Sequence, residues 1–178
     1  MQPFCNFKGI ISKGGLQLKE KTAVVSDQTV IETYFNMVYK LALSQTKNKT
    51  SADDVTQEVF LRYLKHSAKF ESDEHRKAWL IRVTLNCSKN VFSNAWFQKT
   101  VPLSEELVFE EQETGEVYYA VLELPVKYRS VIHLFYYENL SVEEIASVLG
   151  KPPSTIKSQL FRGREMLRSK LKGGDKIV

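Results

Sequence analysis

The sequence predicts an all-α protein made of two small helical modules joined by an acidic linker. Apolar residues recur at three- and four-residue spacing from Thr29 onward, which is the period of an amphipathic helix. No segment has a convincing strand pattern. The charge also changes sign along the chain, because residues 1–96, 97–150 and 151–178 carry net charges of +5, −7 and +6. This pattern is typical of two polyanion-facing parts joined by a segment that repels nucleic acid.

The overall composition excludes several classes of protein. With 178 residues, 43% of them hydrophobic, the chain can bury a core. Cys5 and Cys87 are not spaced for zinc and the three histidines are scattered, so we expect no disulfide framework, metal or cofactor. We find no nucleophile–base pair or phosphate-binding loop, and therefore expect no enzymatic activity. Without a long apolar run or a secretory leader, we expect no membrane insertion and a cytoplasmic location.

The chain is expected to begin with an extension and a first long helix. Residues 1–26 contain three glycines and no sustained period, so we expect them to be poorly ordered. The N-terminal module, residues 27–97, then opens with a helix whose N-cap is expected to be Asp27. The segment "KNKTS" ends this helix.

Two more helices complete the N-terminal module. We expect Ser51 to cap the second helix, with Asp54 completing a variant of the capping box. The apolar face of this helix comprises Val55, Val59, Phe60, Tyr63 and Leu64. After the loop "HSAKFESDE", a third helix begins near Ser72 or Asp73 and continues past Asn90.

An acidic linker, residues 98–116, separates the two modules. Its segment "SEELVFEEQETGE" holds six glutamates and no basic residue, which is a linker composition. The C-terminal module, residues 117–174, starts with the short helix "VYYAVLEL", and Pro125 begins the next one.

The end of the chain has the pattern of a helix-turn-helix. Ser141 and Glu144 form a capping box, Ala146 is small enough for close helix packing, and Gly150 permits the turn. The following helix would present its polar N-terminal end to the major groove. The candidate DNA contacts are Ser154, Thr155, Lys157, Ser158, Arg162 and Arg164.

A merely solvated basic face is the alternative interpretation of this last helix. The capping box, the stop glycine and the hydroxyl-rich helix start occur together, however, and this combination favours DNA binding. A single module of this kind makes few phosphate contacts and binds weakly, so we expect a second contact elsewhere.

Four segments carry a resemblance to a known family. They are "DDVTQEVFLRYLK", "KAWLIRVTLN", "LPVKYRSVIHLFYYENLSVEEIASVLG" and "STIKSQLFRGREML". In this order and spacing they resemble bacterial RNA polymerase sigma factors of the extracytoplasmic-function (ECF) type, over about Thr29 to Leu171. The resemblance implies a promoter-specificity subunit, which binds core RNA polymerase and directs initiation at promoters with −35 and −10 elements.

The resemblance also implies that the second helix binds the polymerase. This helix would dock on the clamp helices of the largest polymerase subunit, through Asp54, Gln57, Glu58 and Arg62. Helical spacing agrees, because Asp54, Glu58 and Arg62 are four residues apart and share one polar stripe. A solvated charged face is the alternative interpretation of this stripe.

The loop and third helix would engage the −10 element, where strands separate and a base is captured. Aromatic planes, polar groups and cations suit that task. The candidates are Phe70, Lys77, Trp79, Arg82 and Asn86. Trp79 also fits a purely structural role, because it lies among apolar neighbours. The helix-turn-helix would read the −35 element as a duplex.

Further partners follow from the resemblance alone. We expect a contact with the polymerase flap, and an anti-sigma factor that covers the docking surfaces. The charge of the linker adds a hypothesis, that its glutamates would occupy a basic RNA path of the polymerase before the transcript does.

The chain departs from the family pattern at three places. An acidic residue and an arginine run are common where this chain has Asn90 and few cations, so grip beyond the −10 element would be weaker or rely on Trp96 and Phe97. The last helix starts with "PPST" where a glycine is common, and has Gln159 where an arginine is common. Promoter specificity therefore cannot be taken from a relative.

Two other functions fit parts of the sequence. A stand-alone helix-turn-helix repressor or activator would bind duplex DNA tightly without polymerase, but it leaves the polar stripe of the second helix without a role. A helical adaptor with no DNA role would show negligible DNA affinity and no dependence on salt.

Overall fold

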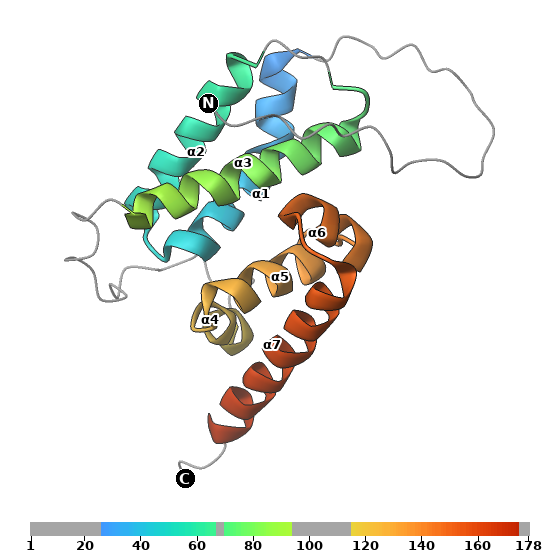
Figure 1. Ribbon diagram of the computed structural model, residues 1–178. Helices are drawn as coiled ribbons and strands as arrows, with labels where there is room; N and C mark the ends of the chain where they lie inside the picture. Colours follow the sequence, from blue (N-terminus) through green and yellow to red (C-terminus); the bar gives the residue numbers. More distant parts are fainter. Residues whose placement is uncertain (1–25, 67–69, 94–114, 175–178) are drawn as a thin grey trace.

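The computed structural model describes residues 26–66, 70–93 and 115–174, and these ranges contain seven helices and no strand (Figure 1). The predicted all-α class is therefore confirmed. The expected extension, apart from Ser26, and most of the expected linker lie outside the described residues.

Three helices form the N-terminal module. They are α1 (Asp27–Thr46), α2 (Lys49–Leu64) and α3 (Asp73–Ser93), and α1 packs against both of the others. The apolar stripes that the sequence predicts meet in one cluster, which includes Val30, Val38, Ala52, Val59 and Leu80. The helical period places these side chains on inward faces and leaves the polar stripes outside.

Two predicted helix starts in this module are wrong. The N-cap of α1 is Ser26 rather than Asp27, because the Ser26 hydroxyl accepts the Thr29 N–H at 3.1 Å. The second helix starts earlier than predicted, at Asn48, whose Oδ1 accepts the Ser51 N–H at 2.8 Å. Lys47 ends α1 in the left-handed region, with φ of 57°. The chain thus turns in two residues, and Ser51 lies buried inside α2.

Four helices form the C-terminal module. They are α4 (Glu116–Leu122), α5 (Val126–Tyr136), α6 (Val142–Leu149) and α7 (Pro153–Gly174). The local signals predicted here are present. Ser141 and Glu144 form the complete capping box, and Gly150 ends α6 with φ of 62°. A side chain at that φ would be strained, so glycine suits the turn.

The two modules lie against each other. In Figure 1, α6 lies beside α3, and the contacts between helices also join α1 to α5. Leu41, Ile81 and Leu85 of the N-terminal module are buried in the same apolar cluster as side chains of α4–α7. Among the described helices, none is both long and apolar enough to span a bilayer.

Candidate nucleic-acid interface

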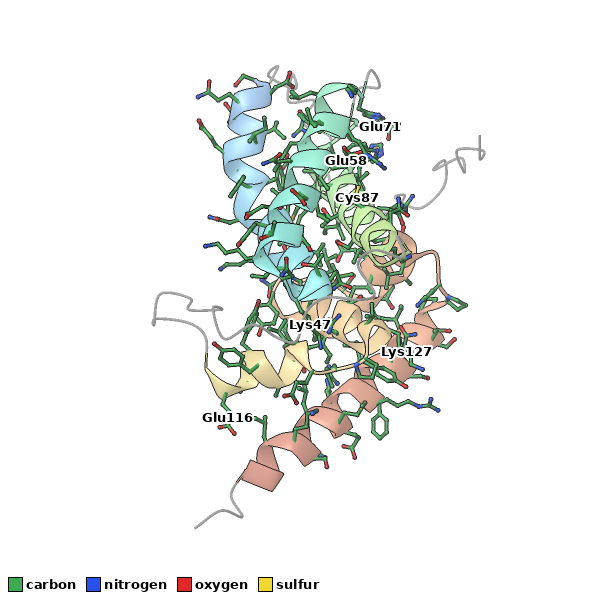
Figure 2. The ribbon with its side chains drawn as sticks, turned by 90° about the vertical axis from the view of Figure 1, so that its left-hand side faces the viewer. Lys47, Glu58, Glu71, Cys87, Glu116 and Lys127 are labelled. Carbon is green, nitrogen blue, oxygen red and sulfur yellow. The ribbon has the colours of Figure 1, made fainter. Side chains whose placement is uncertain are left out.

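The four residues predicted on α2 share its exposed face. Asp54, Gln57, Glu58 and Arg62 are all exposed, and Glu58 is labelled in Figure 2. The Arg62 Nε donates to Glu58 Oε1 at 2.7 Å, which fixes the two side chains as an i,i+4 pair. The opposite face carries the buried Val55 and Val59.

Sequence reasoning missed the apolar part of this exposed face. Leu64, expected in the core, is 52% exposed, and Leu61 is 49% exposed. Both lie at the C-terminal end of α2, next to Arg62. A surface that combines a fixed ion pair with exposed leucines is suited to a protein partner, since interfaces bury an apolar centre inside a polar rim. The signal in the sequence was the surplus of apolar residues on α2, more than one stripe can bury.

Phe70 and Trp79 belong to an aromatic cluster where the loop meets α3. The Phe70 ring lies 5.7 Å from Trp79, 5.1 Å from His66 and 5.6 Å from His75 between ring centroids. Tyr63, from α2, stacks on Phe70 at 6.0 Å. Phe70 and Trp79 are half-buried and pack against the core of the N-terminal module. The structural role considered for Trp79 thus describes its packing, and the Arg76 guanidinium lies 5.5 Å from the centroid of the Phe70 ring.

The three polar residues predicted on α3 differ in their surroundings. Asn86 is exposed. The Lys77 Nζ instead donates to the Glu138 carbonyl at 3.0 Å, and Arg82 donates to the carbonyls of Ser147 and Val148. The structure therefore does not gather the five predicted residues on one open surface, because both cations among them, Lys77 and Arg82, contact the C-terminal module.

The predicted DNA contacts on α7 lie together along one helix. Ser154, Lys157, Ser158, Arg162 and Arg164 are exposed, and Thr155 is half-buried. The inner side of α7 carries the buried Ile156 and Leu160. Gly163 allows this side to approach α5 closely, because a Cβ there would lie 3.0 Å from Ile132 Cγ1.

Arg164 contacts two aromatic residues of α5. Its Nε donates to the Tyr136 hydroxyl at 2.9 Å, and its guanidinium lies 5.4 Å from the Phe135 ring centroid. A cation fixed in this way can contact a phosphate with little loss of side-chain entropy.

Phe161 is a residue of this surface that sequence reasoning missed. Its side chain is 65% exposed, more than any other large hydrophobic residue that the structure describes. It lies on one helical stripe with Lys157 and Arg164, four residues after the first and three before the second. The sequence offered a signal for it, because Phe161 is an apolar residue at a position that helical spacing places on the basic side of the helix.

The described residues offer no site for a metal. Within residues 26–66, 70–93 and 115–174, no group of three or more His, Cys, Asp or Glu side chains is placed to hold an ion. The exposed face of α2 offers charged and apolar side chains to a protein, and the exposed basic side of α7 offers cations to a polyanion.

Comparisons with known proteins match both modules. A family model described as Sigma-70 region 2 matches residues 30–97, and one described as Sigma-70, region 4 matches residues 114–167. The ECF RNA polymerase sigma factor SigW of Bacillus subtilis is 28% identical over 163 residues, covering 80% of this chain and 87% of SigW. SigM of the same organism, also an ECF sigma factor, is 29% identical over 152 residues, covering 79% of this chain and 91% of SigM.

Solved structures share the fold. The sigma factor RpoE of Bartonella quintana, in complex with the anti-sigma factor NepR, superposes with a TM-score of 0.65 at 21% identity. The match covers 82% of this chain and 96% of that one. CnrH, in complex with the cytosolic domain of CnrY, gives a TM-score of 0.63 at 23% identity, covering 83% of this chain and 88% of CnrH.

Proposed function

This chain belongs to the sigma-70 family, in its extracytoplasmic-function group, and we propose how its modules divide the work of a promoter-specificity subunit. A sigma subunit binds core RNA polymerase and directs initiation at promoters. The stand-alone repressor is not favoured, because region 2 as well as region 4 is matched. The proposed division has residues 27–97 dock on the polymerase and engage the −10 element, residues 98–116 link the modules, and residues 117–174 read the −35 element.

The polymerase contact is proposed for the exposed face of α2. Asp54, Gln57, Glu58 and Arg62 would meet the clamp helices of the largest subunit, and the flap would meet the C-terminal module. The exposed Leu61 and Leu64 support this, because they supply apolar area that a clamp helix can bury. Ion pairs around them would set the register of docking more than its affinity.

The −10 contact is proposed for the aromatic cluster and the cations of α3. A base that leaves the stack needs a ring to lie against. Phe70 is half-buried, with Tyr63 stacked on it and the Arg76 guanidinium 5.5 Å from its ring centroid, so a base would lie against the edge of this cluster or displace Arg76. Asn86, exposed on the same helix, can pair with a base edge. Lys77 and Arg82 would contact phosphates once they are released from the carbonyls that they now contact.

The −35 contact is proposed for the exposed side of α7. Ser154, Thr155, Lys157 and Ser158 stand at the end that enters the major groove, with Arg162 and Arg164 beyond them. The single observation that carries this proposal is that five of these six side chains are exposed on one helix behind a complete capping box and turn. Phe161, at the centre of the row, would contact a thymine methyl group.

The remaining parts of the proposal concern partners and location. An anti-sigma factor is proposed as an inhibitor, since the sigma factor RpoE, which shares this fold, forms a complex with one. The chain itself is proposed to catalyse nothing and to act in the cytoplasm, where the polymerase is.

Run-off transcription on a promoter library tests the proposal, with bacterial core polymerase and with or without this chain. We expect chain-dependent starts that share an upstream and a downstream motif. The double variant Asp54→Ala with Gln57→Ala should lose these starts. Its matched control, Glu32→Ala with Asn36→Ala, removes one carboxylate and one amide from the exposed side of α1 and should keep them. Tight duplex binding without any new start would instead favour the repressor.

A further inference from the structure

A pocket lies where the end of α1 meets the turn between α4 and α5. Its volume is about 390 Å³, which is in the range of pockets that bind small molecules. Gln45, Thr46 and Lys47 line it from the end of α1, and residues 123–126 and Arg129 line it from the C-terminal module. Lys47 is labelled in Figure 2, where the end of α1 comes close to the C-terminal module. None of these residues belongs to the proposed DNA contacts or to the polymerase face of α2.

The lining of this pocket includes a buried arginine without a counter-ion. Arg129 is 2% exposed, and its guanidinium donates to three backbone carbonyls, two in its own module and that of Gln45 in α1. Within the described part of the chain, its Nε–H has no hydrogen-bond partner and no carboxylate forms an ion pair with it. Burial lowers the pKa of Arg129 to about 10, so the side chain stays charged near neutral pH. Because a buried charge without a partner is unfavourable, an anion in the pocket would stabilise it.

Two lysines add to the positive charge of the pocket. Lys47 is half-buried, and burial together with the charge of Arg129 lowers the pKa of its ammonium group. Lys170 of α7 is the third cation, and it pairs with Glu123, the carboxylate of the pocket lining. The carboxyl-terminal ends of α1 and α4 contribute about half a negative charge each. Three cations, one carboxylate and two helix ends therefore leave the group with a net positive charge.

The rest of the lining is apolar. Leu124, Pro125 and Val126 contribute to it, and Val126 is 45% exposed. A few polar groups within a largely apolar wall are typical of pockets for small molecules, because the polar groups orient the ligand and the apolar wall buries its body. The pocket can thus take an anionic group with a small organic body attached.

We propose that this pocket binds a small molecule that carries a phosphate group, with Lys47 as its direct contact and the buried charge of Arg129 supporting it. A phosphate group carries a charge of about −2 near neutral pH, which matches these two cations better than the single charge of a carboxylate. Arginine and lysine are also the side chains that most often recognise phosphate. The inference does not depend on the sigma assignment, because no promoter or polymerase contact enters it.

Isothermal titration calorimetry on the full chain tests the proposal at constant ionic strength. The probes are inorganic phosphate, inorganic pyrophosphate and ATP, each titrated separately. We expect one-to-one binding of pyrophosphate, of ATP or of both. Binding of ATP without pyrophosphate would identify an organic phosphate as the ligand, whereas binding of pyrophosphate as tight as that of ATP would identify the phosphate group itself.

A charge-removing variant tests the direct contact. Lys47→Gln should weaken binding about ten-fold or more, the effect of losing one charge-assisted hydrogen bond. Its matched control is Lys157→Gln, which removes the same charge from the exposed basic side of α7 and should keep the wild-type affinity. Arg129 is left in place, because its replacement would leave three buried carbonyls without their donor and could unfold the chain.

A charge-adding variant tests the pocket without touching a cation. Val126→Glu puts a carboxylate in the pocket lining, where it should compete with the ligand and abolish binding. Val126 is the first residue of α5, a position where an acidic side chain favours the helix, so the variant should fold. The matched control is Val117→Glu, which makes the same change at an exposed valine of α4 outside the pocket and should bind like the wild type.

Three results would overturn the proposal. The first is the absence of one-to-one binding with all three probes. The second is a loss in Lys157→Gln as large as that in Lys47→Gln, which would show that the probes bind basic surfaces in general. The third is a Val126→Glu variant that binds like the wild type while circular dichroism shows that its helices are retained. A failure of the chain to direct transcription would leave all of these measurements unchanged, so it is distinguishable from each of them.

Discussion

Phe161 is an exposed aromatic residue in a position where it can contact a bound ligand. It stands at the centre of the row of polar and basic side chains on α7, and its side chain is 65% exposed. On duplex DNA the apolar partner available in the major groove is the C5 methyl group of thymine. A contact of this kind would add specificity that no hydrogen bond on α7 supplies.

Phe161→Ala should therefore weaken promoter use by on the order of 1 kcal/mol, or about five-fold in apparent affinity. Replacing thymine by uracil in the upstream element removes the methyl group and should produce a similar loss in the wild type. The variant should be insensitive to that replacement, because the contact is already gone. Additive losses would show that Phe161 contacts something other than the methyl group.

Titration of the Tyr118 hydroxyl, in α4, should make the free energy of unfolding depend on pH in the alkaline range. Burial raises the pKa of Tyr118 to about 12, helped by the nearby Tyr137. The unfolded chain loses this proton near its ordinary value of about 10. Between these values the unfolded state binds fewer protons than the folded state, so the free energy of unfolding falls as pH rises from about 10 to 12.

The Tyr118→Phe variant should lose this part of the pH dependence. Urea unfolding at pH 9 and at pH 11.5 measures it, with a wild-type loss that exceeds the variant's by up to about 2 kcal/mol. The comparison with the variant removes the contribution of the other tyrosines and lysines. Equal losses in both proteins would mean that the Tyr118 hydroxyl titrates alike in the folded and unfolded chains.

At the scale of single elements, the helix-turn-helix is defined by local signals. The Ser141 hydroxyl accepts the Glu144 N–H at 3.2 Å, and Glu144 Oε2 accepts the Ser141 N–H at 2.7 Å. Gly150 then turns the chain and α7 begins at Pro153. Proline suits a first helical position because it lacks the N–H that would be unpaired there.

Ser141→Ala should cost about 1 kcal/mol of unfolding free energy, the usual contribution of a helix cap. Urea unfolding measures it. Ser169→Ala, at an exposed position inside α7, is the matched control and should change stability by a few tenths of a kcal/mol at most. Similar effects of the two substitutions would show that the capping box is not what stabilises α6.

The elements that sequence reasoning predicted well are those whose signals lie within a few residues. The capping box, the turn glycine and the start at Pro125 are of this kind, and all are present. The start of α2 was misplaced because Lys47, a non-glycine residue, takes the left-handed conformation, and Asn48 then caps the next helix directly. Propensity alone gives no reason to expect that conformation at a lysine.

At the scale of the whole molecule, the interface between modules had no sequence signal. Arg82 and Lys77 are residue types that commonly contact nucleic acid. Their partners here are backbone carbonyls more than sixty positions away in the sequence. A carbonyl is present at every residue, so no pattern marks the ones that are used. Leu41, Ile81 and Leu85 were equally consistent with a core confined to one module, because periodicity gives the buried face and not its partner.

This interface should make the chain unfold as one unit. Burying side chains such as Leu41, Ile81 and Leu85 contributes about 1.5–3 kcal/mol each, and that contribution is lost to either module when the other unfolds. Both tryptophans, Trp79 and Trp96, precede the C-terminal module, so tryptophan fluorescence reports on the N-terminal part of the chain. Amide hydrogen exchange in α7 reports on the other part.

In urea, fluorescence and α7 exchange should give the same free energy of unfolding for the wild type, as a two-state transition requires. Gln45→Lys puts an ammonium group beside the buried Arg129 and removes the oxygen that accepts from the Ser130 hydroxyl. It should separate the two free energies, because each module then unfolds without the stabilisation that the other supplies. Asn36→Lys, which adds the same charge to the exposed side of α1, should leave them coincident. Two distinct transitions in the wild type would mean that the modules contact each other too weakly to unfold as one unit. Coincident transitions that survive Gln45→Lys would mean that the apolar cluster couples the modules without the hydrogen bond from the Ser130 hydroxyl to Gln45 Oε1.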